Sequence, residues 1–210
     1  EKSGHLNLGT PGVMCVGAAC GCYVEYLYFK TVGVFYINPA LAVILPIIAT
    51  LIGSALMGAI FCFLTVTLRV NQNVTGLAMT TFGVGFGNFF GGSLVKLSGA
   101  DMPFLALSST SNCFKKTLPI ADKLGVFGDL VLGYSFLVYL AIAIALISSF
   151  IIKRTRVGLH LRAVGENPAT ADSAGINVNR YKYLATCIGC MIAGLGGLYY
   201  VMDYASGIWA

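Results

Sequence analysis

Residues 130–152 read LVLGYSFLVYLAIAIALISSFII, a stretch of 23 residues that contains no Asp, Glu, Lys or Arg. A helix needs about 20 predominantly apolar residues to cross the hydrocarbon core of a bilayer, so this stretch is long enough to span a membrane. Comparable charge-free runs recur at 31–68, 70–95 and 183–202. Because the pattern recurs along the whole chain, a cleaved signal peptide does not explain it, and several spanning helices are predicted.

The composition of the 210-residue chain favours the same class. Hydrophobic residues make up 57% of the chain and charged residues 10%, whereas soluble domains carry about 25% charged residues. We therefore predict an all-α, polytopic helical membrane protein that forms one transmembrane domain over residues 1–210. The chain begins at Glu1 and ends just past an apolar run, and it is interpreted as a fragment that lacks both ends. About five spanning helices are expected, at 9–29, 40–66, 74–95, 131–152 and 183–203.

The distribution of Lys and Arg predicts an orientation. Six of these residues fall in the short segment 153–182: Lys153, Arg154, Arg156, Arg162, Arg180 and Lys182. Positive residues are enriched in cytoplasmic loops, so this segment is predicted to lie in the cytoplasm, together with Lys2 and Arg69. Segment 96–130 then lies outside. The placement of the positive residues is therefore more informative than the formal net charge of +5. No nucleic-acid partner is predicted.

The predicted span at 74–95, VTGLAMTTFGVGFGNFFGGSLV, is rich in glycine and polar residues. At 100° per residue four glycines share one stripe, where another helix could approach closely: Gly76, Gly83, Gly87 and Gly91. A polar arc lies beside the stripe: Asn73, Thr80, Thr81 and Asn88. Uncompensated amides in hydrocarbon cost several kcal/mol each, so the arc needs an explanation. Two explanations remain open. The polar residues could form hydrogen bonds between helices, or they could line a translocation path.

The polar segment 158–183, GLHLRAVGENPATADSAGINVNRYKY, separates two apolar runs. Asn167 followed by Pro168 favours a helix start, with Asn as the N-cap and Pro at the first helical position. Gly175 suits the left-handed residue that often ends a helix. The spacing predicts a helix of about 10 Å at about 168–174 on the cytoplasmic face. On physical grounds alone it could be a passive connector or a stiff protrusion on which another protein acts.

The stretch TRVGLHLRAVGENPATADSAGINVNRYKYLAT, residues 155–186, closely resembles the cytoplasmic loop of permease subunits of bacterial ABC importers. The branch concerned serves ribose-type sugars, branched-chain amino acids and nucleosides. Its pattern, G-x-x-x-R-A-x-G-x-N-P-x-A-A-x-x-x-G-I-N, is matched except at Thr170, where the family often has Ala. The resemblance implies that the 168–174 helix is a coupling helix that docks on an ATPase subunit. The ATPase-coupling candidates are Arg162, Gly165, Glu166, Asn167, Pro168, Ala171, Asp172 and Gly175.

The opening EKSGHLNLGTPG, residues 1–12, narrows the resemblance to one branch of these permeases. It is similar to the E-K-S-G-x-x-N-I-G-x-E-G of permeases that work with basic-membrane-lipoprotein binding proteins and import nucleosides. Thr10 and Pro11 replace the usual residue and acid. With Asn7 of this motif added to the polar arc, the candidate substrate-path residues are Asn7, Asn73, Thr80, Thr81 and Asn88.

The resemblance covers essentially the whole chain and implies the permease subunit of an ATP-driven importer of a small polar solute. Nucleosides are the first expectation, with ribose-type sugars or branched-chain amino acids as alternatives. The implied partners are cytoplasmic ABC ATPase subunits, a second permease chain, identical or related, and an extracytoplasmic lipoprotein or substrate-binding protein. The implied location is the lipid of the bacterial plasma membrane, which the chain crosses several times.

The chain is not expected to be an enzyme or to hold a metal or cofactor. It has no G-x-x-x-x-G-K-[ST] loop, so ATP hydrolysis is assigned to a separate subunit. Cys187-Ile-Gly-Cys190 is interpreted as helix packing. An ion-coupled secondary transporter is the alternative from another class, and it needs an ionisable group within the membrane. Glu25 and Asp203 are the nearest acids, and both are expected at solvated span ends.

Overall fold

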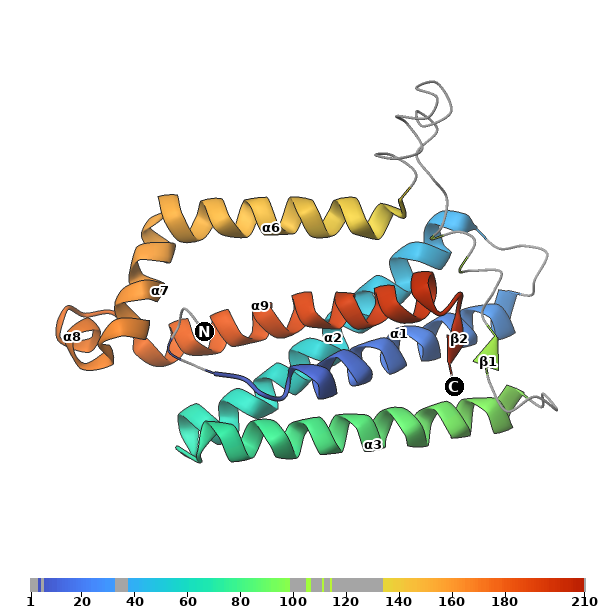
Figure 1. Cartoon of the computed structure of the whole chain (residues 1–210), viewed down its shortest axis with the longest axis horizontal. Helices are drawn as coiled ribbons and strands as arrows, with labels where there is room; N and C mark the ends of the chain where they lie inside the picture. Colours follow the sequence, from blue (N-terminus) through green and yellow to red (C-terminus); the bar gives the residue numbers. More distant parts are fainter. Residues whose placement is uncertain are drawn as a thin grey trace, which may run out of the picture.

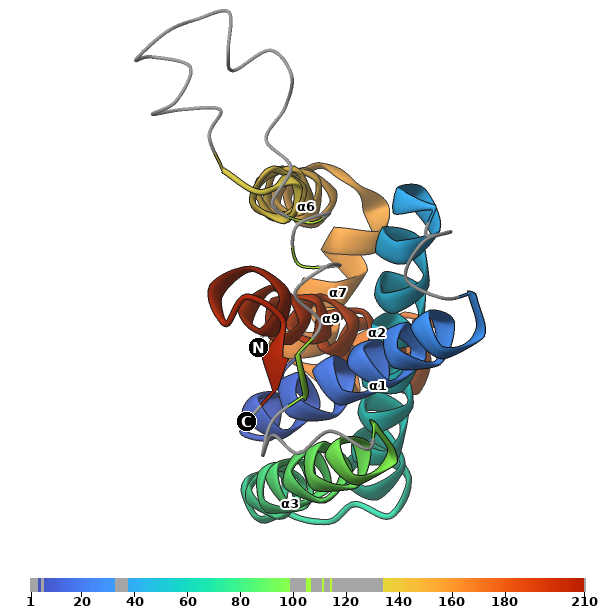
Figure 2. The same cartoon turned by 90° about the vertical axis from the view of Figure 1, so that its right-hand side faces the viewer.

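The computed structural model describes residues 4, 6–32, 38–98, 105–106, 111, 114 and 134–209. They form a helical bundle whose long helices run side by side (Figures 1 and 2). These long helices are α1 (Thr10–Val32), α2 (Pro39–Cys62), α3 (Gln72–Ser98), α6 (Phe136–Arg154) and α9 (Val178–Tyr199). Short π-helical segments continue two of them, η2 (Phe63–Thr67) after α2 and η4 (Tyr200–Tyr204) after α9. The remaining elements are α7 (Arg156–Glu166), α8 (Pro168–Ser173), β1 (Leu105–Ala106) and β2 (Ile208–Trp209).

The prediction of an all-α, polytopic membrane protein is confirmed. Within the described residues, four helices are long and apolar enough to cross a membrane: Thr10–Val32, Ala40–Thr67, Phe136–Arg154 and Val178–Tyr204. The fifth expected span corresponds to α3, which at 27 residues is about 40 Å long. Its glycines, threonines and amides lower its hydropathy, and α3 does not join the other four by that criterion.

The last long helix begins earlier than the sequence predicted. The Asn177 side chain accepts a hydrogen bond from the backbone N–H of Arg180 at 3.1 Å and caps α9, which starts at Val178 rather than at 183. The charge-free run marks only the apolar part of this helix. Arg180 and Lys182 therefore lie on its first two turns instead of in a loop.

Helix α1 occupies the centre of the bundle and packs on α2, α3 and α9 (Figure 2). The contacts are so close that glycine is required on both sides. A methyl group at Gly83 of α3 would overlap the backbone of Gly12 of α1, and one at Gly197 of α9 would overlap the carbonyl of Met14. The predicted glycine stripe on α3 therefore faces α1 at Gly83 and the residues just before α1 at Gly76. The fourth glycine of the stripe, Gly91, lies in the part of α3 whose side chains are not described.

Helix α6 stands at the edge of the bundle, with only 6% of its apolar window buried (Figure 2). An apolar groove of about 480 Å³ lies between α6 and α9, lined among others by Leu140, Ile144 and Leu195. These side chains form a surface suited to hydrocarbon.

The expected position of Glu25 was wrong. Its side chain is 0% exposed within α1, whereas the sequence placed it at the solvated end of a span. The reason is that α1 continues to Val32, nearly two turns beyond Glu25. Asp203 lies in η4, close to the end of α9, and is half-buried.

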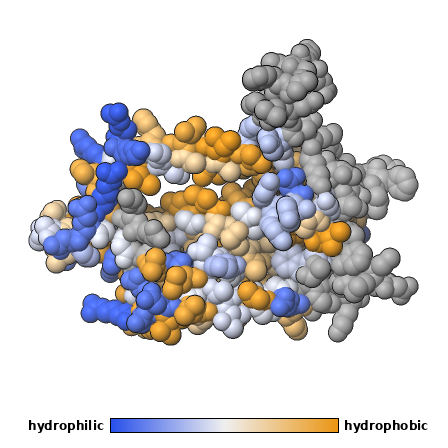
Figure 3. Space-filling view, in the orientation of Figure 1, coloured by the Kyte–Doolittle hydropathy of each residue, from blue (hydrophilic) through white to orange (hydrophobic). Residues whose placement is uncertain are grey.

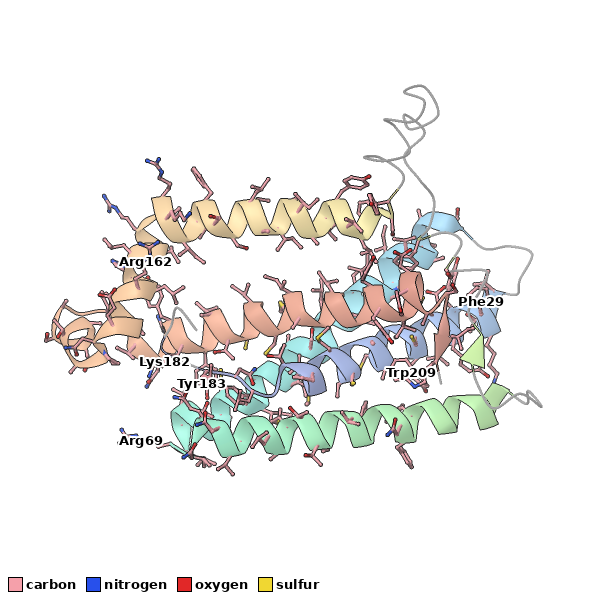
Figure 4. All side chains as sticks on the ribbon, in the orientation of Figure 1. Phe29, Arg69, Arg162, Lys182, Tyr183 and Trp209 are labelled. Carbon is pink, nitrogen blue, oxygen red and sulfur yellow. The ribbon has the colours of Figure 1, made fainter. Side chains whose placement is uncertain are left out.

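One end of the bundle is strongly basic. It carries α8, the end of α6 and the turn between η2 and α3 (Figures 1 and 3). We call it the basic end, and it holds Arg69, Lys153, Arg154, Arg156, Arg162, Arg180 and Lys182. Arg69, Arg162 and Lys182 lie there in Figure 4, whereas Phe29 lies at the opposite end. In the described part of the chain, the opposite end holds Lys30 and Lys96, and Lys2 lies outside that part.

Candidate functional site

The turn from α6 into α7 starts the polar segment at the basic end. The Thr155 hydroxyl accepts a hydrogen bond from the Gly158 N–H at 3.2 Å and caps α7. A methyl group at Gly158 would overlap the carbonyls of Ile151 and Ile152, so the corner is closed tightly. Helix α7 consequently runs across the ends of the long helices rather than along them (Figure 1).

Helix α7 is anchored on α9. The Nδ1 atom of His160 lies 2.8 Å from the hydroxyl of Tyr181, and their rings meet edge to face with centroids 5.6 Å apart. Val164 on the same helix is fully buried. A second polar contact joins η2, the continuation of α2, to α9, since the hydroxyls of Thr67 and Tyr183 are 2.6 Å apart. Polar contacts therefore link α7 to α9, and α9 to η2.

Helix α8 is capped at both ends. The Thr170 N–H donates to the Asn167 side chain at 3.2 Å, and Pro168 occupies the first turn. At the other end Gly175 has φ +81°. Its N–H bonds to the Asp172 carbonyl at 2.9 Å, and the Ile176 N–H bonds to the Ala171 carbonyl at 3.0 Å. These two bonds with a left-handed glycine form a Schellman motif, which fixes the end of a short helix.

The eight coupling candidates divide by exposure. Six are exposed at the basic end: Arg162, Glu166, Asn167, Pro168, Asp172 and Gly175. The other two serve packing. Ala171 is 3% exposed, and Gly165 lies so close to Gly4 that a methyl group on Gly4 would be 3.1 Å from the Gly165 carbonyl oxygen.

The sequence interpretation did not place Arg69 with the coupling candidates. Together with Pro168, Asp172 and Gly175 it lines a cleft of about 610 Å³ at the basic end. A signal was present, because Arg69 is the only charged residue between Lys30 and Lys96. A lone cation between two long apolar runs marks the turn between two helices, and here that turn reaches α8.

Two of the five candidate path residues are engaged at the junction of α1 and α3. The Asn7 side chain accepts a hydrogen bond from the Gly9 N–H at 2.8 Å, and its amide nitrogen lies 3.6 Å from the Sγ of Cys190. The Thr80 hydroxyl donates to the Leu8 carbonyl at 2.9 Å. Both side chains hold the entry into α1 in place.

The other three candidates are exposed on α3. The Thr81 hydroxyl donates to the Leu77 carbonyl of its own helix at 3.1 Å, and Asn73 lies at the start of α3. Asn88 lines a cavity of about 550 Å³ between α1, α3 and the end of α9, where Tyr200 and Trp209 are also found. The members of the predicted arc therefore differ: Thr80 bonds the segment before α1, Asn88 lines a cavity, and Asn73 and Thr81 are exposed away from that cavity.

We expect Thr80→Val to weaken the contact between α3 and the segment that leads into α1. The variant loses the bond to Leu8, and interhelical hydrogen bonds in membranes contribute about 0.6–1.7 kcal/mol. Thr81→Val is the matched control, because among the described residues its hydroxyl bonds to Leu77 of its own helix. Thermal unfolding in detergent should give a lower midpoint for Thr80→Val than for Thr81→Val. Equal midpoints would show that the bond to Leu8 adds no stability.

A comparison with known protein families decides what kind of protein this bundle is. The family described as the permease component of branched-chain amino acid transport systems matches residues 1–210. The chain belongs to this family. The predicted resemblance to ABC importer permeases is thereby confirmed, and the permease is a component of a transporter.

Among the relatives of this permease are transporters of several solutes. It is 30% identical to the guanosine ABC transporter permease NupQ of Bacillus subtilis over 98% of the chain and 61% of that protein. It is 28% identical to the nucleoside ABC transporter permease NupC of Lactococcus lactis over 95% of the chain and 59% of the relative. A putative glucose ABC transporter permease of Haloferax volcanii is 30% identical over 100% of the chain and 57% of that protein. The chain thus spans about three fifths of the length of these relatives, and no solved structure matches it.

Proposed function

We propose that this chain is the membrane-spanning permease of an ATP-driven importer of nucleosides in the bacterial plasma membrane. Membership of the permease family supports the transport class, and guanosine and nucleoside permeases among the relatives favour the substrate. The observation that carries the mechanism is α8, a six-residue helix capped at both ends and largely exposed at the basic end. Such a helix offers another protein a rigid point of contact.

The basic end is the side to which the ATPase subunits bind in this proposal. Positive residues favour the cytoplasmic side of a membrane, and the cations of the basic end support a cytoplasmic position for α7 and α8. Closure of two ATPase subunits on ATP would press on the exposed residues of α8 and on the cleft at Arg69. The contacts His160–Tyr181 and Thr67–Tyr183 would carry the displacement to α9 and α2.

The remaining partners follow from the same class of transporter. An extracytoplasmic lipoprotein or substrate-binding protein would deliver the solute at the end opposite α8. A second permease chain, identical or related, would complete the path across the membrane. Helix α2 has an exposed apolar face for this chain or for lipid, formed by Leu41, Ile44, Ile48, Ile52 and Leu56.

The sugar branch and the ion-coupled class are the competing functions. A putative glucose permease among the relatives favours the first. The buried Glu25 is the observation that favours the second, because an ionisable group inside a membrane often serves ion coupling. The family match supports ATP-driven transport over ion coupling.

Reconstitution separates these functions. The full-length permease, its ATPase subunits and its binding protein are placed in proteoliposomes, and uptake of uridine, guanosine, ribose and glucose is measured. We expect ATP-dependent uptake of the two nucleosides that persists after ionophores collapse the proton and sodium gradients. Uptake of glucose without nucleosides would replace the proposed substrate. Uptake driven by an ion gradient without ATP would overturn the importer class.

A further inference from the structure

The cavity that contains Asn88 has an unusual wall for a membrane bundle. It measures about 550 Å³, within the range of about 300–1,000 Å³ typical of small-molecule sites. Two aromatic side chains line it, Tyr200 from η4 and Trp209 from β2. Asn88 and Gly87 line it from α3, and Met14 lines it from α1. We call it the aromatic cavity.

The backbone after α9 is folded so that Trp209 reaches this cavity. The chain reverses at two residues with left-handed backbone, Ser206 (φ 55°) and Gly207 (φ 75°). Strand β2 then pairs antiparallel with β1, with Trp209 opposite Leu105. Trp209 lies inward from the end of the bundle marked by Phe29, beside α3 (Figure 4). A segment of π-helix precedes the reversal, and such segments are frequent at functional sites.

The Trp209 ring meets α3 at a position that has no side chain. A methyl group at Gly87 would lie 3.4 Å from the Cζ2 atom of Trp209, so the indole rests against the helix backbone beside Asn88. Asn88 is 16 residues beyond the start of α3, which places it about 24 Å along a helix of about 40 Å. The amide is therefore well inside the span, at a depth where few polar groups occur.

These groups suit one class of solute. Every nucleobase has a flat π-face that stacks on aromatic side chains without regard to its identity. An Asn side chain offers a donor and an acceptor to the polar edge of a base. A free sugar has no such face. The aromatic cavity combines two aromatic rings, one amide inside the span and apolar surroundings. This combination favours a nucleobase over ribose or glucose.

We propose that the aromatic cavity is a binding site for the base of the transported nucleoside, with Trp209 and Tyr200 as stacking surfaces and Asn88 as the hydrogen-bonding group. The proposal rests on the proposed nucleoside import and adds a location and a mode of recognition. Stacking selects a base without distinguishing purine from pyrimidine, so this site accepts uridine and guanosine alike.

The first test measures occupancy in the wild-type protein. Cys15 lines the aromatic cavity and is half-buried, while Cys187 on α9 is equally half-buried and does not line it. The full-length complex in proteoliposomes is treated with a small methanethiosulfonate reagent, and labelling of each cysteine is followed by peptide mass spectrometry. Uridine at about twice its Kd should slow labelling of Cys15 about threefold. Cys187 should be labelled at an unchanged rate, and ribose should protect neither.

The second test measures uptake in variants of the cavity. Trp209→Leu and Asn88→Leu should each reduce uridine uptake about tenfold, the scale of one lost stacking contact for Trp209 and of the lost hydrogen bonds for Asn88. Trp209→Phe keeps an aromatic face and should retain most of the uptake. Phe89→Leu is the matched control, because Phe89 is exposed on α3 next to Asn88 and does not line the aromatic cavity. This control should transport like the wild type.

The two tests distinguish this site from the proposed function. If the wild-type complex imports nucleosides while uridine leaves Cys15 labelling unchanged, the site is overturned and the function stands. Wild-type uptake in Trp209→Leu and Asn88→Leu would overturn it as well. Import of glucose alone by the wild type would overturn both. Protection of Cys15 by ribose would assign the cavity to the sugar rather than to the base.

Discussion

Replacing Gly83 by leucine should prevent the permease from forming its native bundle. A Cβ atom at this position would overlap the backbone of Gly12, so α1 and α3 would have to separate along the contact. Overpacking a close contact costs about 1–3 kcal/mol, and more when the backbone has to move. Because α1 also packs on α2 and α9, the displacement would reach the whole bundle. We expect little monodisperse protein after solubilisation, measured by size-exclusion chromatography, and no uptake.

Gly85→Leu is the matched control for this prediction. It makes the same change two residues along the same helix, at an exposed position where a Cβ atom meets nothing within 4 Å. A glycine inside a helix is itself unfavourable by about 0.5–1 kcal/mol relative to alanine, so this variant should be at least as stable as the wild type. If Gly83→Leu and Gly85→Leu behave alike, α1 and α3 do not make the close contact described here.

The sequence predicted the structure best where a single local property of the chain determines it. Charge-free runs of bilayer length identified α2, α3, α6 and α9, since hydrocarbon tolerates few charges. The glycine periodicity of 74–95 identified the side of α3 that faces a neighbour, because only glycine allows such an approach. Asn167 and Gly175 marked the ends of α8, because capping depends on local residue chemistry.

The sequence was less informative where contacts distant in the chain decide the structure. The burial of Glu25 depends on how far α1 continues past it. The position of α7 depends on contacts with α9, such as the one between His160 and Tyr181. Likewise, the arc on α3 looked uniform, but Thr80 meets Leu8 whereas Asn88 faces Trp209 and Tyr200. No pattern within one helix contains that information.

Replacing Gly175 by valine should uncouple the importer while leaving the bundle intact. The left-handed conformation at φ +81° costs a residue with a Cβ atom about 1–2 kcal/mol, and a β-branched residue is the least suited to it. Open space surrounds this position, with nothing within 4 Å of a Cβ atom, so the penalty is purely conformational. It would be relieved by breaking the Schellman bonds of Gly175 and Ile176, which would free the end of α8.

The measurement is ATP hydrolysis by the reconstituted complex with and without nucleoside-loaded binding protein. A cost of about 1.4 kcal/mol corresponds to a factor of about 10, so stimulated hydrolysis and uptake should both fall about tenfold in Gly175→Val. Gly175→Asn is the matched control, because Asn adopts the left-handed conformation at helix ends, and it should retain most of both activities. Both variants should insert and purify like the wild type, since the strain lies outside the spans. If Gly175→Val hydrolyses ATP and transports normally, α8 is a passive connector and the ATPase acts on the permease elsewhere.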